Sequence, residues 1–296
     1  MKEYEFSDKI MGTELNVSII AENEEDAKNG YEEVLIIAKE YEAKFSRFNK
    51  DSELSQLNTE KTKKVSEEFL LVTKIAGKLY EDTENLFNPL LQVEKIGYDE
   101  SFEKIKDRKS FEKDSGLINT KMDEIKIIES ESKIILDQNQ KLDFGGFLKG
   151  YVSEIMCKKL SEKFKGVIVN LGGDIFTTGL DENQENFIFV IENPIDKSLS
   201  IKVPLRDSSM ATSGNYKRKW KINNETISHI VDKSGKNPKT DLISATILSE
   251  HGHLAEGFAT AALCLNSKEA KEFLDKKNIS YLLITKDGEI LTNLTI

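Results

Sequence analysis

Residues Leu142–Tyr151 read LDFGGFLKGY, which places a carboxylate, two adjacent glycines, a lysine and a third glycine at the predicted start of a helix. Glycines allow a backbone to approach a ligand closely, and the free N–H groups of a helix N-terminus attract phosphate. The segment therefore favours either a phosphate cradle, to which Lys149 adds a positive charge, or a tight turn with an N-terminal cap. Downstream, Val169–Ile175 (VNLGGDI) is a buried strand that runs into a second double glycine, which is either an ordinary turn or a second wall of that cradle.

Outward from these glycines, predicted strands outnumber predicted helices, and several neighbouring strands form hairpins. We expect helices over Glu24–Phe45, from a cap at Ser66 to Tyr80, over Gly146–Phe164, over Leu254–Leu265 and after a capping box of Asn266 and Glu269. We expect strands over Leu15–Ile20, Val167–Asn170, Thr226–Val231 and Ser244–Leu248, and strand pairs over 124–128 and 133–137, 187–191 and 199–203, and 281–285 and 289–294. This order is typical of an α+β fold with mixed or antiparallel sheets. Because no linker or repeat interrupts the chain, we expect a single compact domain over residues 1–296, with 99–120 as a surface excursion.

The composition excludes several classes of protein. The chain has 296 residues, of which 38% are hydrophobic and 32% are charged, and its 42 Lys and Arg against 52 Asp and Glu give a net charge of −10. This acidic balance argues against nonspecific nucleic-acid binding, and no apolar run is long enough to span a membrane. Met1–Asp8 lacks the apolar core of an export signal, so the chain either stays in the cytoplasm or begins after a removed signal. We expect Cys157 and Cys264 to be buried thiols that form neither a disulfide nor a metal site.

Three further segments carry side chains that are suited to chemistry. In AEGFAT at Ala255–Thr260, Glu256 and Thr260 lie one helical turn apart, where they either offer hard oxygen donors to Mg²⁺ or are solvated. His229, within SHIVDKSG at 228–235, is either a general base or a structural histidine. Phe48, within FSRFNKDSELSQLN at 45–58, either stacks on a flat ligand or packs on the core.

Taken in order, these segments resemble the ApbE family, the FAD:protein FMN transferases. The matching pieces are MGT at 11–13, the 45–58 segment, FNPLL at 87–91, LDFGGFLKGY at 142–151, VNLGGDI at 169–175, ATSGNY at 211–216, SHIVDKSG at 228–235 and AEGFAT at 255–260. The resemblance implies a T-fold-like α+β domain that binds FAD in a cleft. It also implies Mg²⁺-dependent cleavage of the FAD pyrophosphate and transfer of FMN to a threonine hydroxyl of an acceptor flavoprotein of an electron-transfer system, with release of AMP. Members of the family are often extracytoplasmic and membrane-anchored.

The resemblance also implies roles for individual residues. Positions that contact FAD fall on Met11, Phe48, Ile96, Gly97, Tyr98, Asp143, Lys149 and Val231. Metal positions fall on Gly146, through its carbonyl oxygen, and on Glu256 and Thr260. His229 matches the residue that activates the acceptor threonine, and Asp143 is the second catalytic candidate.

The sequence departs from the family pattern at several positions. Glu256 replaces the usual aspartate, and Ala259 replaces a second carboxylate found in some relatives, so a weaker metal site is expected. The Pro-Leu loop is reduced to NPLLQ, and no proline follows Asp232. Two alternatives remain beside the transferase, namely an FAD pyrophosphatase with water as the acceptor and a noncatalytic flavin-binding protein. The transferase is favoured because the catalytic, nucleotide and metal positions occur together.

Overall fold

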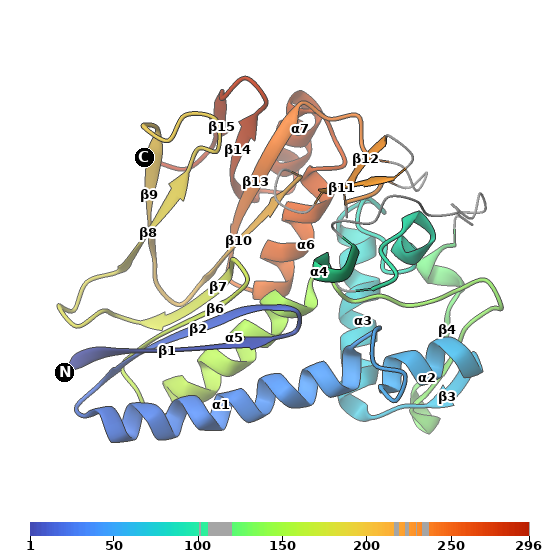
Figure 1. The fold of residues 1–296 in the computed structure, drawn as a ribbon, viewed down its shortest axis with the longest axis horizontal. Coiled ribbons are helices and arrows are strands. Elements are labelled where there is room, and N and C mark those ends of the chain that lie inside the picture. The colour runs from blue at the N-terminus through green and yellow to red at the C-terminus, as the bar shows by residue number, and fades with distance from the viewer. Residues whose placement is uncertain are drawn as a thin grey trace. The chain divides into compact units, whose positions relative to one another are not determined.

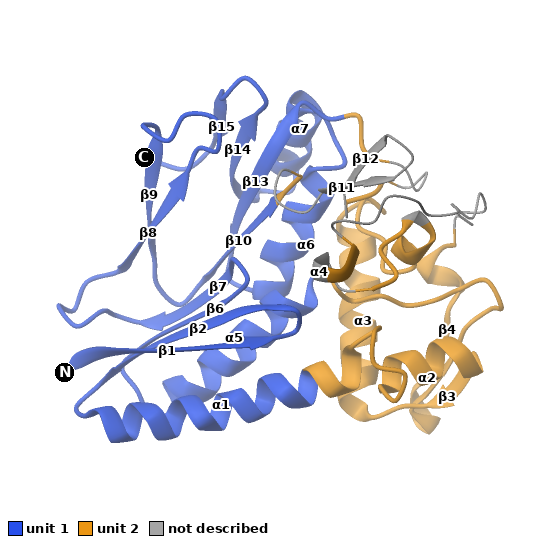
Figure 2. Cartoon of the chain, viewed as in Figure 1, with its two compact units in different colours: residues 1–41, 147–213, 240–296 blue, residues 42–146, 214–239 orange. Residues whose placement is uncertain are grey.

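The computed structural model describes residues 1–100, 102–105, 120–215, 219–222, 225–228, 230–232 and 237–295. The chain divides into two compact units (Figure 2): unit 1 contains Met1–Tyr41, Phe147–Ser213 and Thr240–Ile296, and unit 2 contains Glu42–Gly146 and Gly214–Lys239. Both units combine helices with antiparallel strand pairs, which confirms the predicted α+β class with antiparallel sheets.

Unit 1 is built on an eight-stranded sheet with the strand order β1-β2-β6-β7-β10-β13-β14-β15 (Figure 1). Its strands are β1 (Lys2–Ile10), β2 (Thr13–Ala21), β6 (Gly166–Leu171), β7 (Asp174–Gly179), β10 (Ser209–Gly214), β13 (Leu242–Ser249), β14 (Ser280–Thr285) and β15 (Ile290–Thr292). Strands β1 and β2 are joined by the two-residue turn Met11–Gly12, whose φ angles of 53° and 69° match the twist of a β-hairpin. Strands β6 and β7 are joined through Gly172–Gly173, so the second double glycine is a hairpin turn.

Helices cover one face of this sheet, and a small hairpin covers the other. The helices are α1 (Glu24–Phe45, whose last residues enter unit 2), α5 (Leu148–Ser161), α6 (Gly252–Ala262) and α7 (Ser267–Lys276). Helix α5 packs on β6 and β7, α6 packs on β13, and α7 packs on β14. The hairpin consists of β8 (Phe187–Glu192) and β9 (Ser200–Leu205), and its inner side chains form a core with Ile175 of β7 and Leu282 of β14. The middle of the sheet is therefore covered on both faces. It also fixes α5 and α6, which carry Lys149 and Glu256.

Unit 2 is smaller and has short strands. Its helices are α2 (Glu53–Glu60), α3 (Glu67–Asp82), α4 (Phe102–Ile105) and the 3₁₀ turns η1 (Val93–Ile96), η2 (Met122–Glu124) and η3 (Glu129–Glu131). Its strands are β3 (Thr62–Lys64), β4 (Lys126–Ile128) and β5 (Lys133–Ile135), in the order β3-β5-β4, and the hairpin of β11 (Lys219–Ile222) and β12 (Glu225–Ser228). Three buried aromatic rings, those of Phe45, Phe69 and Phe144, pack with centroids 5.2–5.8 Å apart and form the centre of its core.

Most predicted elements are confirmed, and the errors have physical causes. Helix α1 covers the predicted residues, and the predicted caps of α3 and α7 are present. The helix predicted from Gly146 begins only at Leu148, because Phe147 has a non-helical φ of −153°. The strand predicted to end at Val231 ends at Ser228. The sequence patterns do not predict β1, an edge strand in which only Tyr4, Phe6 and Ile10 are shielded from water, or β7, in which five of the six residues are buried.

Some predictions fall outside the described residues. They include the part of the expected surface excursion at residues 101 and 106–119, and the catalytic candidate His229. Both cysteines are free thiols, as predicted, but only Cys157 is fully buried, whereas Cys264 is half-buried. Within the described ranges, no helix is both long and apolar enough to cross a membrane.

Candidate active site

Three charged side chains from three elements of unit 1 meet in the interior. The Lys149 ammonium, on the first turn of α5, donates to the Asp174 carboxylate at the start of β7 and to Glu256 Oε1 of α6, the latter at 2.5 Å. The backbone N–H of Gly150 donates to Glu256 Oε2 at 2.8 Å. Because Asp174 and Glu256 are only 3% and 4% exposed, these contacts replace nearly all of their hydration. We call these three residues the charged cluster.

A close crossing of α5 and α6 brings Lys149 and Glu256 together. A Cβ atom on Gly150 would lie 2.2 Å from the carbonyl oxygen of Gly252, and one on Gly252 would lie 1.9 Å from that of Gly150. Only two glycines allow the backbones to approach this closely. The crossing is also bonded reciprocally, because Glu154 of α5 accepts the Gly252 N–H at 2.8 Å just as Glu256 of α6 accepts that of Gly150.

The charged cluster holds two carboxylates against one ammonium. Burial and the negative charge of Asp174 raise the pKa of the Glu256 carboxyl to about 7, although Lys149 and the Gly150 N–H act in the opposite direction. Burial alone would lower the pKa of the Lys149 ammonium, but the charges of Asp174 and Glu256 raise it above its ordinary value. The ammonium therefore stays charged, and the cluster favours one further positive charge or a proton.

The cluster has the donor chemistry that a hard divalent cation requires. Thr260 lies one turn beyond Glu256 on the same helix, and its hydroxyl is 3.3 Å from that of Ser213. Each oxygen of Glu256 accepts one hydrogen bond and so keeps a second acceptor position. The uncompensated negative charge and these oxygens fit Mg²⁺, which prefers carboxylate and hydroxyl ligands together with water. Among the described residues, no group of three or more His, Cys, Asp and Glu side chains forms a metal site, so side-chain carboxylates and imidazoles alone do not complete a coordination sphere there.

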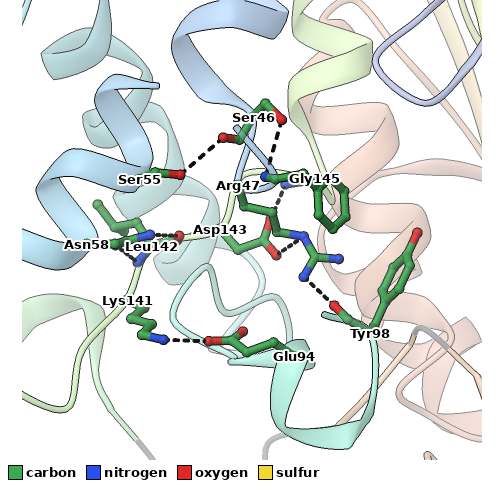
Figure 3. A network of polar contacts seen from close by, with 11 residues as sticks. Ser46, Arg47, Ser55, Asn58, Glu94, Tyr98, Lys141, Leu142, Asp143 and Gly145 are labelled. Atoms are coloured by element: carbon green, nitrogen blue, oxygen red, sulfur yellow. Dashed lines mark hydrogen bonds and ion pairs between the residues drawn. The ribbon is translucent and has the colours of Figure 1, made fainter. Parts of the chain in front are cut away.

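A second polar network lies in unit 2 around Arg47 (Figure 3). Its Nε is 3.3 Å from Asp143 Oδ2, and its Nη1 donates to the carbonyl oxygen of Tyr98 at 2.6 Å. The guanidinium carbon lies 4.4 Å from the ring centroid of Phe48 and 4.5 Å from that of Tyr98. The other oxygen of Asp143 accepts the N–H of Gly145 at 2.8 Å. Three predicted FAD positions, Phe48, Tyr98 and Asp143, therefore surround one arginine.

The same network joins two of the motifs quoted from the sequence. The Asn58 side chain accepts the N–H of Leu142 at 2.7 Å and donates to its carbonyl oxygen at 2.8 Å, as Figure 3 shows. Nearby, Lys141 and Glu94 form an ion pair at 3.0 Å. The end of the 45–58 segment thus holds the backbone of Leu142, the residue before Asp143, while Arg47 of the same segment pairs with Asp143 itself.

The remaining predicted residues are distributed over both units. Met11 occupies the β1–β2 turn of unit 1. In unit 2, the backbone of Ile96 ends η1, Gly97 follows it with a φ of 94°, Gly146 packs against Phe87, and Val231 is buried. The predicted FAD positions Phe48, Tyr98 and Asp143 are brought together in unit 2. In unit 1, Lys149 and Glu256 are in contact, and Thr260 lies one turn from Glu256 on α6. The position of His229 relative to them lies outside the described residues.

Sequence reasoning missed two residues at these sites. Arg47 stands inside the quoted 45–58 segment, and Asp174 stands inside VNLGGDI. The sequence did contain a signal for both residues. Arg47 lies between two aromatic residues and Asp174 follows a buried strand, and a charged side chain in such surroundings needs an opposite charge or a hydrogen-bond partner. Identifying the partners required the fold, since Asp174 and Lys149 are 25 residues apart.

Comparison with known proteins gives consistent results. The ApbE family model matches residues 11–283. The FAD:protein FMN transferase of Haemophilus influenzae is 25% identical over 310 residues, which cover 98% of this chain and 89% of that protein. The FAD:protein FMN transferase of Vibrio cholerae is 24% identical and covers 97% of this chain and 89% of that protein.

Solved structures share the fold. The ApbE protein of Thermotoga maritima superposes with a TM-score of 0.88 at 22% identity, covering 99% of this chain and 98% of that one. The flavin transferase ApbE of Vibrio cholerae gives a TM-score of 0.83 at 23% identity, with 98% and 97% of the two chains covered. Since the family model spans both units and nearly the full length, the chain belongs to the ApbE family.

Proposed function

We propose that this chain is an FAD:protein FMN transferase that uses Mg²⁺ and modifies a threonine hydroxyl of an acceptor flavoprotein. The observation that carries the proposal is the buried charged cluster, in which two carboxylates face one ammonium. The family pattern assigns Glu256 of this cluster to the metal and Lys149 to the nucleotide, whereas Asp174 is found from the fold. The relatives of Haemophilus influenzae and Vibrio cholerae bear this activity in their names. The proposal treats residues 1–296 as one transferase domain, with assigned residues in both units.

In the proposed reaction, the threonine oxygen attacks the phosphorus on the FMN side of the FAD pyrophosphate. A phosphoester bond forms between the acceptor and FMN, the P–O bond to the AMP half breaks, and AMP leaves with the electron pair. The proton of the hydroxyl goes to His229, whose neutral imidazole is a suitable base near pH 7. Phosphoryl transfer of this kind depends on positioning and on charge stabilisation rather than on a covalent enzyme intermediate.

Glu256, Thr260 and the carbonyl oxygen of Gly146 are the residues proposed to hold Mg²⁺. When bound, the ion supplies positive charge that offsets the charge of the pyrophosphate. Lys149 keeps its proton and holds Asp174 and Glu256 in place, so the carboxylate of Glu256 is oriented before any ligand arrives. The Gly150 N–H fixes the second oxygen of Glu256 at 2.8 Å.

Met11, Phe48, Ile96, Gly97, Tyr98, Asp143, Lys149 and Val231 are proposed to contact FAD. In unit 2, Phe48 is 47% exposed, so its aromatic side chain is accessible to a flat ligand such as FAD. Asp143 has both carboxylate oxygens engaged, by Gly145 and Arg47, which supports a role in orienting the nucleotide.

The test is to incubate the purified chain with FAD and Mg²⁺, with and without an acceptor protein that carries a flavinylation threonine. Release of AMP and the intact mass of the acceptor are followed together, and EDTA is added to a parallel sample. A mass gain of one FMN that EDTA abolishes is the expected result. AMP without a mass gain would instead favour the FAD pyrophosphatase, and bound FAD without either product would favour the noncatalytic flavin-binding protein.

The chain offers a matched control for the metal assignment. Glu256→Gln should lower both Mg²⁺ affinity and transfer, because it removes the proposed anionic ligand. Glu154→Gln changes the other buried glutamate of the α5–α6 crossing, which accepts the Gly252 N–H in the same way but lies outside the charged cluster. Equal losses in the two variants would show that the effect comes from the helix crossing and would remove Glu256 from the metal assignment.

A further inference from the structure

Arg47 contacts three of the predicted FAD positions. It pairs with Asp143, donates to the carbonyl oxygen of Tyr98 and lies over the rings of Phe48 and Tyr98. Its side chain is only 17% exposed, although arginine is usually a surface residue. Figure 3 shows the guanidinium between Asp143 and Tyr98.

The shape of the guanidinium explains why these contacts occur together. Its planar face stacks on aromatic rings, while its edge donates several N–H bonds in fixed directions. Both rings lie within the roughly 6 Å range of a cation–π contact. The rings of Phe48 and Tyr98 are inclined by 63° with centroids 6.4 Å apart, so Arg47 adds to a direct edge contact between them. A lysine ammonium has neither the plane nor the fork, and it cannot make the same set of contacts.

We propose that Arg47 is a positioning residue for FAD, which fixes the ring of Phe48, the backbone and ring of Tyr98 and the Asp143 carboxylate in one binding arrangement. This inference rests on the proposed function, because it takes these residues as FAD contacts. Arg47 does not contact the reacting atoms in this proposal. Its loss should therefore weaken FAD binding and leave the chemical step of a fully loaded enzyme nearly unchanged.

The test is Arg47→Lys, which keeps the positive charge but loses the plane and the fork. The matched control is Arg206→Lys, since Arg206 also has its Nε 3.3 Å from a carboxylate, that of Asp207, but is 55% exposed. FAD affinity is measured by calorimetry without acceptor, and KM for FAD and kcat are measured with it. We expect Kd and KM of Arg47→Lys to rise about tenfold with kcat within about twofold of the wild type, and Arg206→Lys to be unchanged.

A second variant, Arg47→Gln, tests the same inference with the positive charge removed. Its side chain has a planar amide without charge, so it should bind FAD at least as weakly as Arg47→Lys. If FAD affinity in both variants stays within about threefold of the wild type, or if kcat falls with KM unchanged, the inference is wrong. Loss of the folded state in both variants overturns it as well, because Arg47 would then hold unit 2 together rather than its FAD contacts. A wild-type chain that binds no FAD refutes the proposed function itself, and this inference with it.

Discussion

Replacing Gly150 by alanine tests whether the α5–α6 crossing builds the charged cluster. The new Cβ would lie 2.2 Å from the carbonyl oxygen and 2.7 Å from the carbonyl carbon of Gly252, and these are backbone atoms that cannot rotate away. Ordinary contact at about 3.5 Å requires the helices to separate by about 1 Å. Both reciprocal hydrogen bonds, Gly150 to Glu256 and Gly252 to Glu154, cross this contact and would lengthen.

The expected magnitude follows from these contacts. Overpacking of a buried contact costs about 1–3 kcal/mol, and a hydrogen bond to a charged group contributes about 1.5–3 kcal/mol. Alanine is a better helix former than glycine by about 1 kcal/mol, which offsets part of the loss. We expect Gly150→Ala to lose about 3 kcal/mol of unfolding free energy, which corresponds to a Tm lower by roughly 5 °C for a chain of 296 residues.

The assay is thermal unfolding followed by circular dichroism, with Gly77→Ala as the control. Gly77 lies inside α3, and a Cβ there would meet only the flexible Met122 side chain at 3.7 Å or more. That variant should keep or slightly raise Tm, because only helix propensity changes. A Tm of Gly150→Ala within 2 °C of the wild type, roughly 1 kcal/mol, would refute the reasoning that the crossing is closed by glycine.

Three further predictions concern buried ionisable groups. Burial lowers the pKa of His253 below its ordinary 6.5, so as the pH falls the imidazole is protonated in the unfolded chain before it is protonated in the folded chain. The unfolding free energy should therefore decline as the pH falls below about 6.5. Urea titrations at several pH values should show a smaller decline for His253→Phe than for the wild type. Burial raises the pKa of the Cys157 thiol to about 12, so a thiol reagent at pH 8 should label Cys264 and spare Cys157, and equal labelling would contradict this. Lys149→Met leaves two buried carboxylates unpaired and should cost about 3–5 kcal/mol of unfolding free energy in urea, whereas a loss below about 1 kcal/mol would mean that water reaches the charged cluster.

Local patterns in the sequence predict much of this fold. The apolar stripe predicts α1 over its observed residues, and the Asn266–Glu269 spacing predicts the capping box of α7, because both depend only on neighbours within one or two turns. Local patterns do not predict strand β1, because it is a largely exposed edge strand. Its position is fixed by pairing with β2 along its whole length.

In the candidate site, too, local patterns predict individual residues but not the contacts between residues far apart in the chain. The motifs identify Lys149, Glu256 and Asp143, but they do not reveal that Lys149 is held between two carboxylates or that Asp143 pairs with Arg47. These pairs join residues 25, 107 and 96 positions apart, respectively, so no local pattern encodes them. The two pairs of Lys149 become visible only when the sheet order and the α5–α6 crossing are known, and the pair of Arg47 and Asp143 becomes visible only with the fold of unit 2.

The charged cluster compensates for the carboxylate that some relatives have at position 259 and this chain lacks. Ala259 is fully buried, so this chain has no carboxylate there, yet the cluster still holds two carboxylates because Asp174 enters it from β7 rather than from α6. With one ammonium between them, they leave a net negative charge in a site shielded from water, where an added cation is attracted more strongly than at the surface. Under the proposed function, the replacement of aspartate by glutamate at position 256 is then not a loss of the ligand. The longer side chain reaches α5 with both oxygens, one to Lys149 and one to Gly150, and it is oriented by α5 as well as by its own helix.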